Sequence, residues 1–429
     1  MEKMRQKGTQ RAAVWRKCHR MERKMEYTEL KRHLRTKVQE RMNYEKDLSD
    51  QEVEDTIDEV LLGDESLVIY PVDVRRKLKR ELFDSLRRLD ILQKYVEDSS
   101  VTEIMINGKD HIFVEQDGRL RELDTGFDSL EKLQDVIQQI VAGCNRVVNE
   151  ASPIVDARLP NGARVNIVMN PVALNGPIVT IRRFPDKPIT MERLLQNDSI
   201  SPEAAEFLEK LVKAKYNIFI SGGTGSGKTT FLNVLSHYIP CEERVITIED
   251  SAELQLQELP NLVRLETRNS NVEGCLEITV RELIRSSLRM RPDRIIVGEV
   301  RGAEAIDMLQ CMNTGHDGSM STGHANSAKD MLSRLENMVL MGVELPLAAI
   351  RQQIASGVDI VVHLGRLRDK SRRVMEISEI TGCENGEIKL NLLFLFEELR
   401  EDSEGNIVGK LKRKGALMRE NKLKAAGLS

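Results

Sequence analysis

Hydrophobic residues recur at helical spacing between positions 74 and 98. The apolar positions, three or four residues apart, are Leu78, Leu82, Leu86, Leu89 and Leu92. This spacing predicts an amphipathic helix from Val74 to about Asp98. The first packed domain is expected to start at Val74. Residues 1–70 are polar, charged and weakly periodic, so the pattern predicts an extended, disordered or partly helical arm.

Short apolar segments separated by turn residues follow up to position 184. Asp117-Gly118 and Pro160-Asn161-Gly162 are residue types that favour turns. The predicted strands are Val101–Asn107, His111–Leu123 split by the Asp117 turn, Ile154–Leu159, Arg164–Met169 and Ile178–Phe184. A helical period over Asp128–Gly143 adds one helix. The segment is therefore expected to be a small α+β N-terminal domain.

Two prolines, Pro185 and Pro188, interrupt both helical and strand patterns and mark a domain boundary. Beyond them a helix (Glu203–Lys215), a strand (Tyr216–Ser221) and a helix (Lys228–His237) alternate, which is typical of an α/β fold. The expected organisation is an arm (1–70), an α+β domain (71–184), a linker (185–190), an α/β domain (191–410) and a basic C-terminal tail (411–429).

Composition narrows the function classes. The chain has 429 residues, a net charge of −4 and 4% aromatic residues, which indicates a soluble protein without broad affinity for nucleic acid. Both ends are basic, but a charge run is more often a solvated surface than a binding site. The six cysteines form no C-x-x-C pair, so neither a zinc site nor a disulfide framework is expected. No apolar run is long enough to span a bilayer.

A glycine-rich segment between a strand and a helix fits G-x-x-x-x-G-K-[ST]. Its backbone N–H groups would converge on phosphate oxygens, Lys228 would reach the β and γ phosphates, and Thr229 would bind Mg²⁺. A glycine turn that only packs strand on helix is the structural alternative. The predicted nucleotide-binding residues are Gly222, Gly223, Thr224, Gly225, Ser226, Gly227, Lys228, Thr229 and Thr230.

Acidic residues follow two later strands. Arg244–Ile248 leads into Glu249, Asp250 and Glu253, and Arg291–Val297 leads into Glu299, with Arg301 available to pair with an acid. Carboxylates at strand ends can orient water or hold Mg²⁺ beside a nucleotide. Without a P-loop upstream, such acids would be read as solvated strand ends.

Two histidines, His316 and His324, flank a further short strand, and both are expected to face the phosphates. A structural role is the usual alternative for a lone histidine. Neither has cysteine or carboxylate partners at metal-ligand spacing, so they are not expected to hold a metal.

These four segments, in this order, resemble the Walker A, Asp box, Walker B and His box of the type II/IV secretion ATPase family, over roughly residues 75–410. The runs 155–166 and 180–184 look like the CpaF branch, which serves tight-adherence pili, and the tetra-cysteine zinc module of some type II relatives is absent. The resemblance implies a RecA-like P-loop ATPase domain, ATP and Mg²⁺ as cofactors, a homo-hexamer, and an N-terminal domain that closes over the nucleotide.

The resemblance also assigns roles. The catalytic glutamate falls on Glu253, and the Walker B glutamate, a Mg²⁺ ligand with Thr229, falls on Glu299. Arginines that stabilise the transferring phosphoryl group fall among Arg158, Arg164, Arg182 and Arg183, and which one acts stays open.

The expected function is a cytoplasmic ATP-hydrolysing motor at the inner face of the cell membrane, working on inner-membrane platform proteins of a secretion or pilus machine. One alternative is a RecA-like motor on nucleic acid, which the sparse aromatic residues and low pI argue against. The other is a nucleotide-binding scaffold without turnover.

Overall fold

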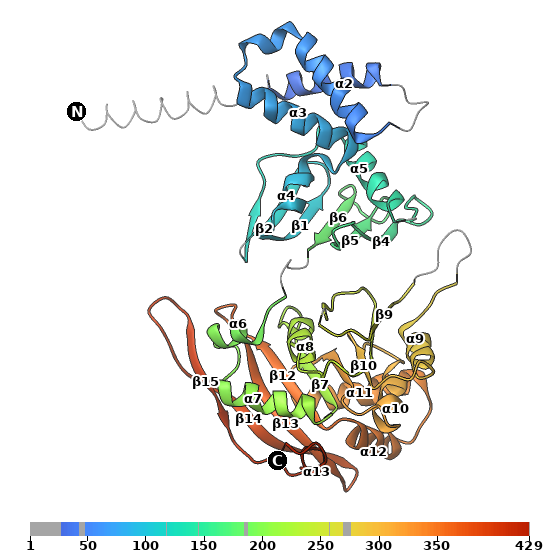
Figure 1. The fold of residues 1–429 in the computed structure, drawn as a ribbon, viewed down its shortest axis with the longest axis vertical. Coiled ribbons are helices and arrows are strands. Elements are labelled where there is room, and N and C mark those ends of the chain that lie inside the picture. Colours follow the sequence, from blue (N-terminus) through green and yellow to red (C-terminus); the bar gives the residue numbers. More distant parts are fainter. Residues whose placement is uncertain are drawn as a thin grey trace, which may run out of the picture. The chain divides into compact units, whose positions relative to one another are not determined.

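The computed structural model describes residues 27–42, 48–116, 118–144, 146–183, 188–256, 258–268 and 276–428. The chain divides into two compact units, Met1–Pro185 and Asp186–Ser429, and Figure 1 labels many of their elements. Of the expected linker, 185–190, residues 185–187 lie outside the described residues.

The first unit begins with helices, in the segment for which the sequence pattern predicted an extended, disordered or partly helical arm. Residues 27–41 are helical, and they pack with the helices that follow around a core containing Leu34, Ile57 and Leu82. The elements are α2 (Asp50–Gly63), η1 (Glu65–Ile69), α3 (Val72–Arg87), η2 (Asp90–Leu92) and α4 (Gln93–Glu97). The expected start of the packed domain at Val74 is therefore wrong. The arm's described part is folded because α2 buries Val53, Ile57 and Val60 on one side of a highly charged helix.

The prediction of a single helix from Val74 to Asp98 is also wrong, because the structure has α3, η2 and α4 in this segment. Helix α3 ends at Arg87, and Asp90 adopts φ +51°, a left-handed conformation that a continuous helix does not contain. Leu92, which the helical period placed on the same face as Leu78, instead packs into the core of the neighbouring sheet.

That sheet has six strands in the order β3-β2-β1-β6-β5-β4, with every neighbouring pair antiparallel. Its elements are β1 (Val101–Asn107), β2 (His111–Gln116), β3 (Arg119–Glu122), α5 (Leu130–Ala142), β4 (Ile154–Arg158), β5 (Arg164–Val168) and β6 (Ile178–Arg182). The predicted strands and helix are confirmed. Gly118 takes φ +73° in the predicted hairpin turn, whereas Asp117 lies outside the described residues.

The second unit contains a nine-stranded sheet in the order β15-β14-β13-β12-β7-β11-β10-β8-β9. From β12 to β9 all neighbours are parallel, and β13, β14 and β15 extend the sheet with antiparallel pairs. The strands are β7 (Ile218–Gly222), β8 (Val245–Glu249), β9 (Leu262–Glu266), β10 (Arg294–Val297), β11 (Met320–His324), β12 (Ile360–Arg366), β13 (Arg372–Glu384), β14 (Glu387–Glu401) and β15 (Ile407–Arg413).

Helices cover both faces of this sheet (Figure 1). Along β7, Ile218 and Ile220 belong to one core and Phe219 to the other, since successive side chains of a strand point to opposite faces. One face is covered by α6 (Met191–Gln196), α7 (Pro202–Lys213) and α8 (Lys228–Ser236), the other by α9 (Val280–Ser287), α10 (Ala305–Asn313), α11 (Ala328–Gly342) and α12 (Leu347–Gly357). This layered arrangement is the predicted α/β fold.

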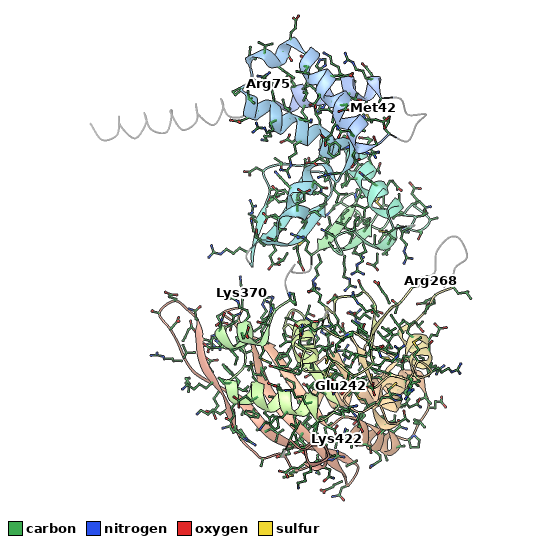
Figure 2. The ribbon with its side chains drawn as sticks, in the orientation of Figure 1. Met42, Arg75, Glu242, Arg268, Lys370 and Lys422 are labelled. Carbon is green, nitrogen blue, oxygen red and sulfur yellow. The ribbon has the colours of Figure 1, made fainter. Side chains whose placement is uncertain are left out.

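The segment expected as a basic tail, 411–429, packs against the second unit as far as it is described. Leu417 is buried, and the backbone N–H groups of Met418 and Arg419 donate to the Glu379 carboxylate at 2.9 and 2.7 Å. Lys422, labelled in Figure 2, lies in α13 (Asn421–Ala425) and bonds to Asp359 at 2.7 Å. In the described part of the chain, no helix is both long and apolar enough to cross a membrane.

Candidate active site

The predicted motifs meet at one edge of the parallel sheet. Strands β7, β11, β10 and β8 are neighbours and run in the same direction, so their C-terminal ends lie together. In register, His324 at the end of β11 pairs with Gly222 at the end of β7, and Val297 of β10 pairs with Ile248 of β8. The P-loop, the His box, the Walker B acid and the Asp box therefore share the edge where open α/β sheets bind ligands.

The P-loop backbone requires glycine at several positions. Gly225 and Gly227 take φ +71° and +93°, and Gly227 is the N-cap of α8. A Cβ on Gly222 would lie 2.5 Å from Ser226 Oγ and 2.6 Å from the Leu364 carbonyl oxygen. Lys228, Thr229 and Thr230 follow in the first turn of α8, whose N-terminus favours a phosphate group. Gly223 and Thr224 complete the loop.

Lys228 is connected to Glu299 through His324. The buried Lys228 Nζ lies 3.1 Å from the Gly223 carbonyl oxygen and 3.3 Å from His324 Nδ1, while His324 Nε2 lies 2.8 Å from Glu299 Oε1. An ammonium group can only donate, so Nδ1 must be the acceptor and Nε2 carries the proton. Burial, together with the charge of Lys228, lowers the pKa of His324, which favours this neutral form.

Arg301 joins the two acidic segments, as its position after Glu299 predicted. Its guanidinium lies 2.7 Å from Glu299 Oε2 and 3.4 Å from Asp250 Oδ2. All three side chains also line an open cavity of about 410 Å³, so the acids are accessible from solvent.

Glu249 fixes the backbone that carries Glu253. Its side chain is 3% exposed, and Oε2 accepts hydrogen bonds from the N–H groups of Glu253 at 2.7 Å and Leu254 at 3.0 Å. Its other oxygen, Oε1, is buried and without a hydrogen-bond partner in the described residues. Burial raises the pKa of Glu249 to about 7. Glu249 therefore acts on the position of the Glu253 segment.

The expectation that His316 faces the phosphates is wrong, because His316 lies at the sheet edge opposite the P-loop of the second unit. His316 precedes β11, and the nearby Gly318 and Ser319 N–H groups donate to Asn217 at the start of β7. A five-residue strand at about 3.3 Å per residue is roughly 16 Å long, so His316 and His324 lie at opposite edges of the sheet.

Two contacts with the P-loop strand and its loop come from residues that carry no motif. The buried His363 on β12 places Nδ1 2.9 Å from Ser221 Oγ, and burial lowers its pKa. Arg372 on β13 donates from Nε to the Gly225 carbonyl oxygen at 2.9 Å. The only sequence signal is a basic run directly after the apolar strand Ile360–Leu364.

In the first unit, three of the candidate arginines form a row across neighbouring strands. Arg158 pairs with Arg164 in the β4–β5 register, and Arg164 pairs with Arg182 in the β5–β6 register. Arg182 lies 3.7 Å from Glu103, whereas Arg183 donates to the Asp98 carbonyl oxygen. Arg183 is not part of this row, and its guanidinium is bound to the Asp98 backbone instead.

The residues fit a nucleotide, since a glycine cradle, a helix N-terminus and a buried lysine converge on one point. Among the described residues, no group of three or more His, Cys, Asp and Glu side chains could hold a metal ion. Thr229 and Glu299 could therefore hold Mg²⁺ only together with phosphate oxygens and water, which is how Mg²⁺ is usually bound at such sites.

A P-loop at the carboxyl edge of a parallel sheet, with acids on neighbouring strands, defines the second unit as a P-loop nucleotide-binding domain. A protein-family model described as "Type II/IV secretion system protein" matches residues 86–393. The chain belongs to this family, which comprises motor ATPases of secretion and pilus machinery.

Individual relatives agree with this assignment. A Mycobacterium tuberculosis protein, provisionally named a conjugal transfer protein, is 34% identical over 71% of this chain and 88% of its own length. The conjugal transfer protein TrbB of Rhizobium radiobacter is 32% identical over 76% of this chain and 97% of its own. The crystal structure of the Legionella pneumophila ATPase DotB covers 67% of this chain and 79% of its own at 23% identity and a TM-score of 0.50, which supports the fold alone.

Proposed function

We propose that this protein hydrolyses ATP to ADP and phosphate and that, as a homo-hexamer, it drives pilus assembly or secretion as a CpaF-like motor. One observation carries the proposal: His324 lies between Lys228 and Glu299, with separations of 3.3 Å from Nδ1 to the Lys228 Nζ and 2.8 Å from Nε2 to the Glu299 Oε1, at the sheet edge that holds the P-loop. A scaffold that only stores nucleotide has no need to link the P-loop lysine to a Walker B acid.

Each residue has a distinct task in this proposal. Lys228 exchanges the Gly223 carbonyl and His324 for phosphate oxygens when nucleotide binds, because an ammonium group prefers anionic acceptors. Glu253 orients the attacking water and accepts its proton, while Glu249 holds the Glu253 backbone in place. Thr229 and Glu299 would hold Mg²⁺, which would supply charge neutralisation at the phosphates.

In this proposal the first unit supplies arginines that stabilise the transferring phosphoryl group, and the row of Arg158, Arg164 and Arg182 supports this role. Residues directly opposite on neighbouring antiparallel strands point to the same face of the sheet, so paired guanidinium groups can contact one anion together. We assign phosphoryl stabilisation to Arg164 and Arg182, which pair directly in the β5–β6 register. Arg183 is not assigned, since it bonds to the Asp98 carbonyl.

Phosphate release by the purified full chain tests the proposed enzyme. Lys228→Ala should reduce turnover at least 100-fold, and Glu253→Gln should reduce it by roughly 10²–10⁴-fold while ATP still binds. Lys213→Ala is the matched control, because this lysine lies on α7 and pairs with Glu209 one turn away. Wild-type turnover in Lys228→Ala would refute the site, and stimulation by single-stranded DNA would favour a nucleic-acid motor.

The same assay tests the arginines and the assembly. Arg164→Gln or Arg182→Gln should lower turnover about 10³-fold if either stabilises the transferring phosphoryl group. Arg121→Gln, on β3 of the same sheet, should not change turnover. Mass measurement with a non-hydrolysable ATP analogue should give a hexamer. Membrane recruitment only in cells that contain the platform proteins of a tight-adherence pilus would support the CpaF-like branch and a location at the inner membrane face.

A further inference from the structure

The hairpin between β12 and β13 lies beside the P-loop. Strand β12 is the parallel neighbour of β7, with Leu364 opposite Gly222, so the chain continues past the sheet edge at the level of the loop. The hairpin turns around Lys370, which is labelled in Figure 2 and takes φ +68°. Its two sides return to register at Arg366 and Arg372, which pair directly across the hairpin.

Both arginines lie against the P-loop tip. Arg372 donates from Nε to the Gly225 carbonyl oxygen at 2.9 Å, and its Cδ lies 3.4 Å from where a Cβ on Gly227 would be. The Nη1 atom of Arg366 lies 3.6 Å from the corresponding point on Gly225. Two guanidinium groups thus approach the two glycines whose positive φ shapes the phosphate cradle.

Two nearby arginines are held by other partners, Arg368 by carboxylates and Arg373 by backbone carbonyl oxygens. Arg368, on the same hairpin, lies 2.6 Å from a Glu398 oxygen and 3.1 Å from a Glu401 oxygen. Arg373 is buried and donates to the Asp198 and Ile407 carbonyl oxygens. In the parts of the chain that are described, Arg366 and Arg372 have no carboxylate within salt-bridge distance. Two like charges opposite each other repel, and a bound anion would relieve that repulsion.

Strand order indicates which part of the anion they meet. The hairpin lies on the β12 side of β7, whereas the Walker B and Asp box acids follow β10 and β8 on the other side. Those acids belong to the γ-phosphate end in the proposed function. The hairpin therefore approaches the opposite end of the phosphate chain.

We propose that Arg366 and Arg372 bind the α-phosphate end of the nucleotide held by the P-loop of their own subunit. This inference rests on the proposed function and adds two binding residues to it. The α-phosphate is present in both ATP and ADP and does not react, so these contacts are equally strong before and after hydrolysis. Uniform binding of this kind lowers KM and leaves kcat unchanged.

Titration of the full chain with a fluorescent ADP analogue tests the assignment. Arg366→Gln and Arg372→Gln should each weaken ADP binding about tenfold, as expected for one charge-assisted hydrogen bond, and should raise KM for ATP with kcat retained. Lysine at either position should recover part of the affinity, since it keeps the charge but not the fork. Arg368→Gln is the matched control and should bind ADP like the wild type.

The outcomes separate the two levels of the argument. Wild-type protein that binds ADP and hydrolyses ATP, with an Arg366→Gln/Arg372→Gln variant that binds ADP equally well, overturns this inference alone. Wild-type protein that binds no nucleotide overturns the proposed function as well. Mixing the double variant with Lys228→Ala subunits, at an ATP concentration below the KM of the double variant, tests the same-subunit assignment: no gain in turnover is expected, and turnover above the sum of the separate samples would contradict it.

Discussion

Replacing Glu249 with glutamine should change how the stability of the protein depends on pH. Burial raises the pKa of this carboxyl from 4.5 to about 7. An acid with a raised pKa in the folded state contributes its full stability below its unfolded pKa and loses it as pH rises through the folded pKa. The stability that Glu249 contributes is therefore lost progressively between about pH 4.5 and pH 7, and none of it remains well above pH 7.

The size of the effect follows from the shift. At about 1.4 kcal/mol per pH unit, the shift corresponds to about 3 kcal/mol in full and to about 2.5 kcal/mol between pH 5 and pH 8. Glutamine at position 249 does not titrate, and its amide oxygen can still accept the N–H groups of Glu253 and Leu254. The free energy of unfolding of Glu249→Gln should thus rise relative to the wild type by about 2.5 kcal/mol over this range.

Urea unfolding followed by circular dichroism at pH 5, 6, 7 and 8 measures the difference. Thr247→Val is the matched control, because Thr247 is a buried neighbour on the same strand and has no titrating group. Its difference from the wild type should stay constant with pH. Parallel curves for Glu249→Gln and the wild type would show that the carboxylate is ionised at no cost, and the burial argument would then be wrong.

Three further substitutions are expected to act through buried contacts. Arg294→Met should lower stability by about 3–5 kcal/mol, because the fully buried guanidinium pairs with Glu243 at 2.6 Å, and adding Glu243→Gln should recover part of that loss in the same urea titrations. Asn217→Ala should cost about 2–4 kcal/mol, since its side chain bonds to the Met312, Gly357 and Gly318 backbones, and the midpoint of thermal unfolding should fall. Gly227→Ala should weaken ADP binding in the fluorescence titration and lower stability by about 1–2 kcal/mol, because its φ of +93° strains any residue with a Cβ.

The sequence predicted the strands of the first unit, the elements next to the motifs and the motif edge for a physical reason. Strands such as β7 and β8 are short, fully buried apolar runs next to motif residues, so both their limits and their direction follow from local pattern. The parallel order then brings Glu299 and His324 to the P-loop without further information.

What the sequence did not predict depends on contacts between distant segments. Arg372 reaches Gly225 only because β12 pairs with β7, and no local pattern encodes that pairing. His316 and His324 are close in sequence, yet a short strand places them at opposite edges of the sheet. The limits and the packing of the helices before Val74 were not predicted, because their apolar positions are few and lie among charged residues.

The packed C-terminal segment makes it possible to measure local opening next to the N-terminal end of β7, the strand that leads into the P-loop. Tyr216 donates to the Arg419 carbonyl oxygen at 2.6 Å, and Lys422 and the Asn217 N–H group both bond to Asp359. Arg419 and Lys422 are trypsin cleavage sites, but cutting there first requires this anchorage to open locally. The rate of trypsin cleavage at these two residues therefore reports how often the contacts next to β7 open. A nucleotide that stabilises the domain should lower this cleavage rate.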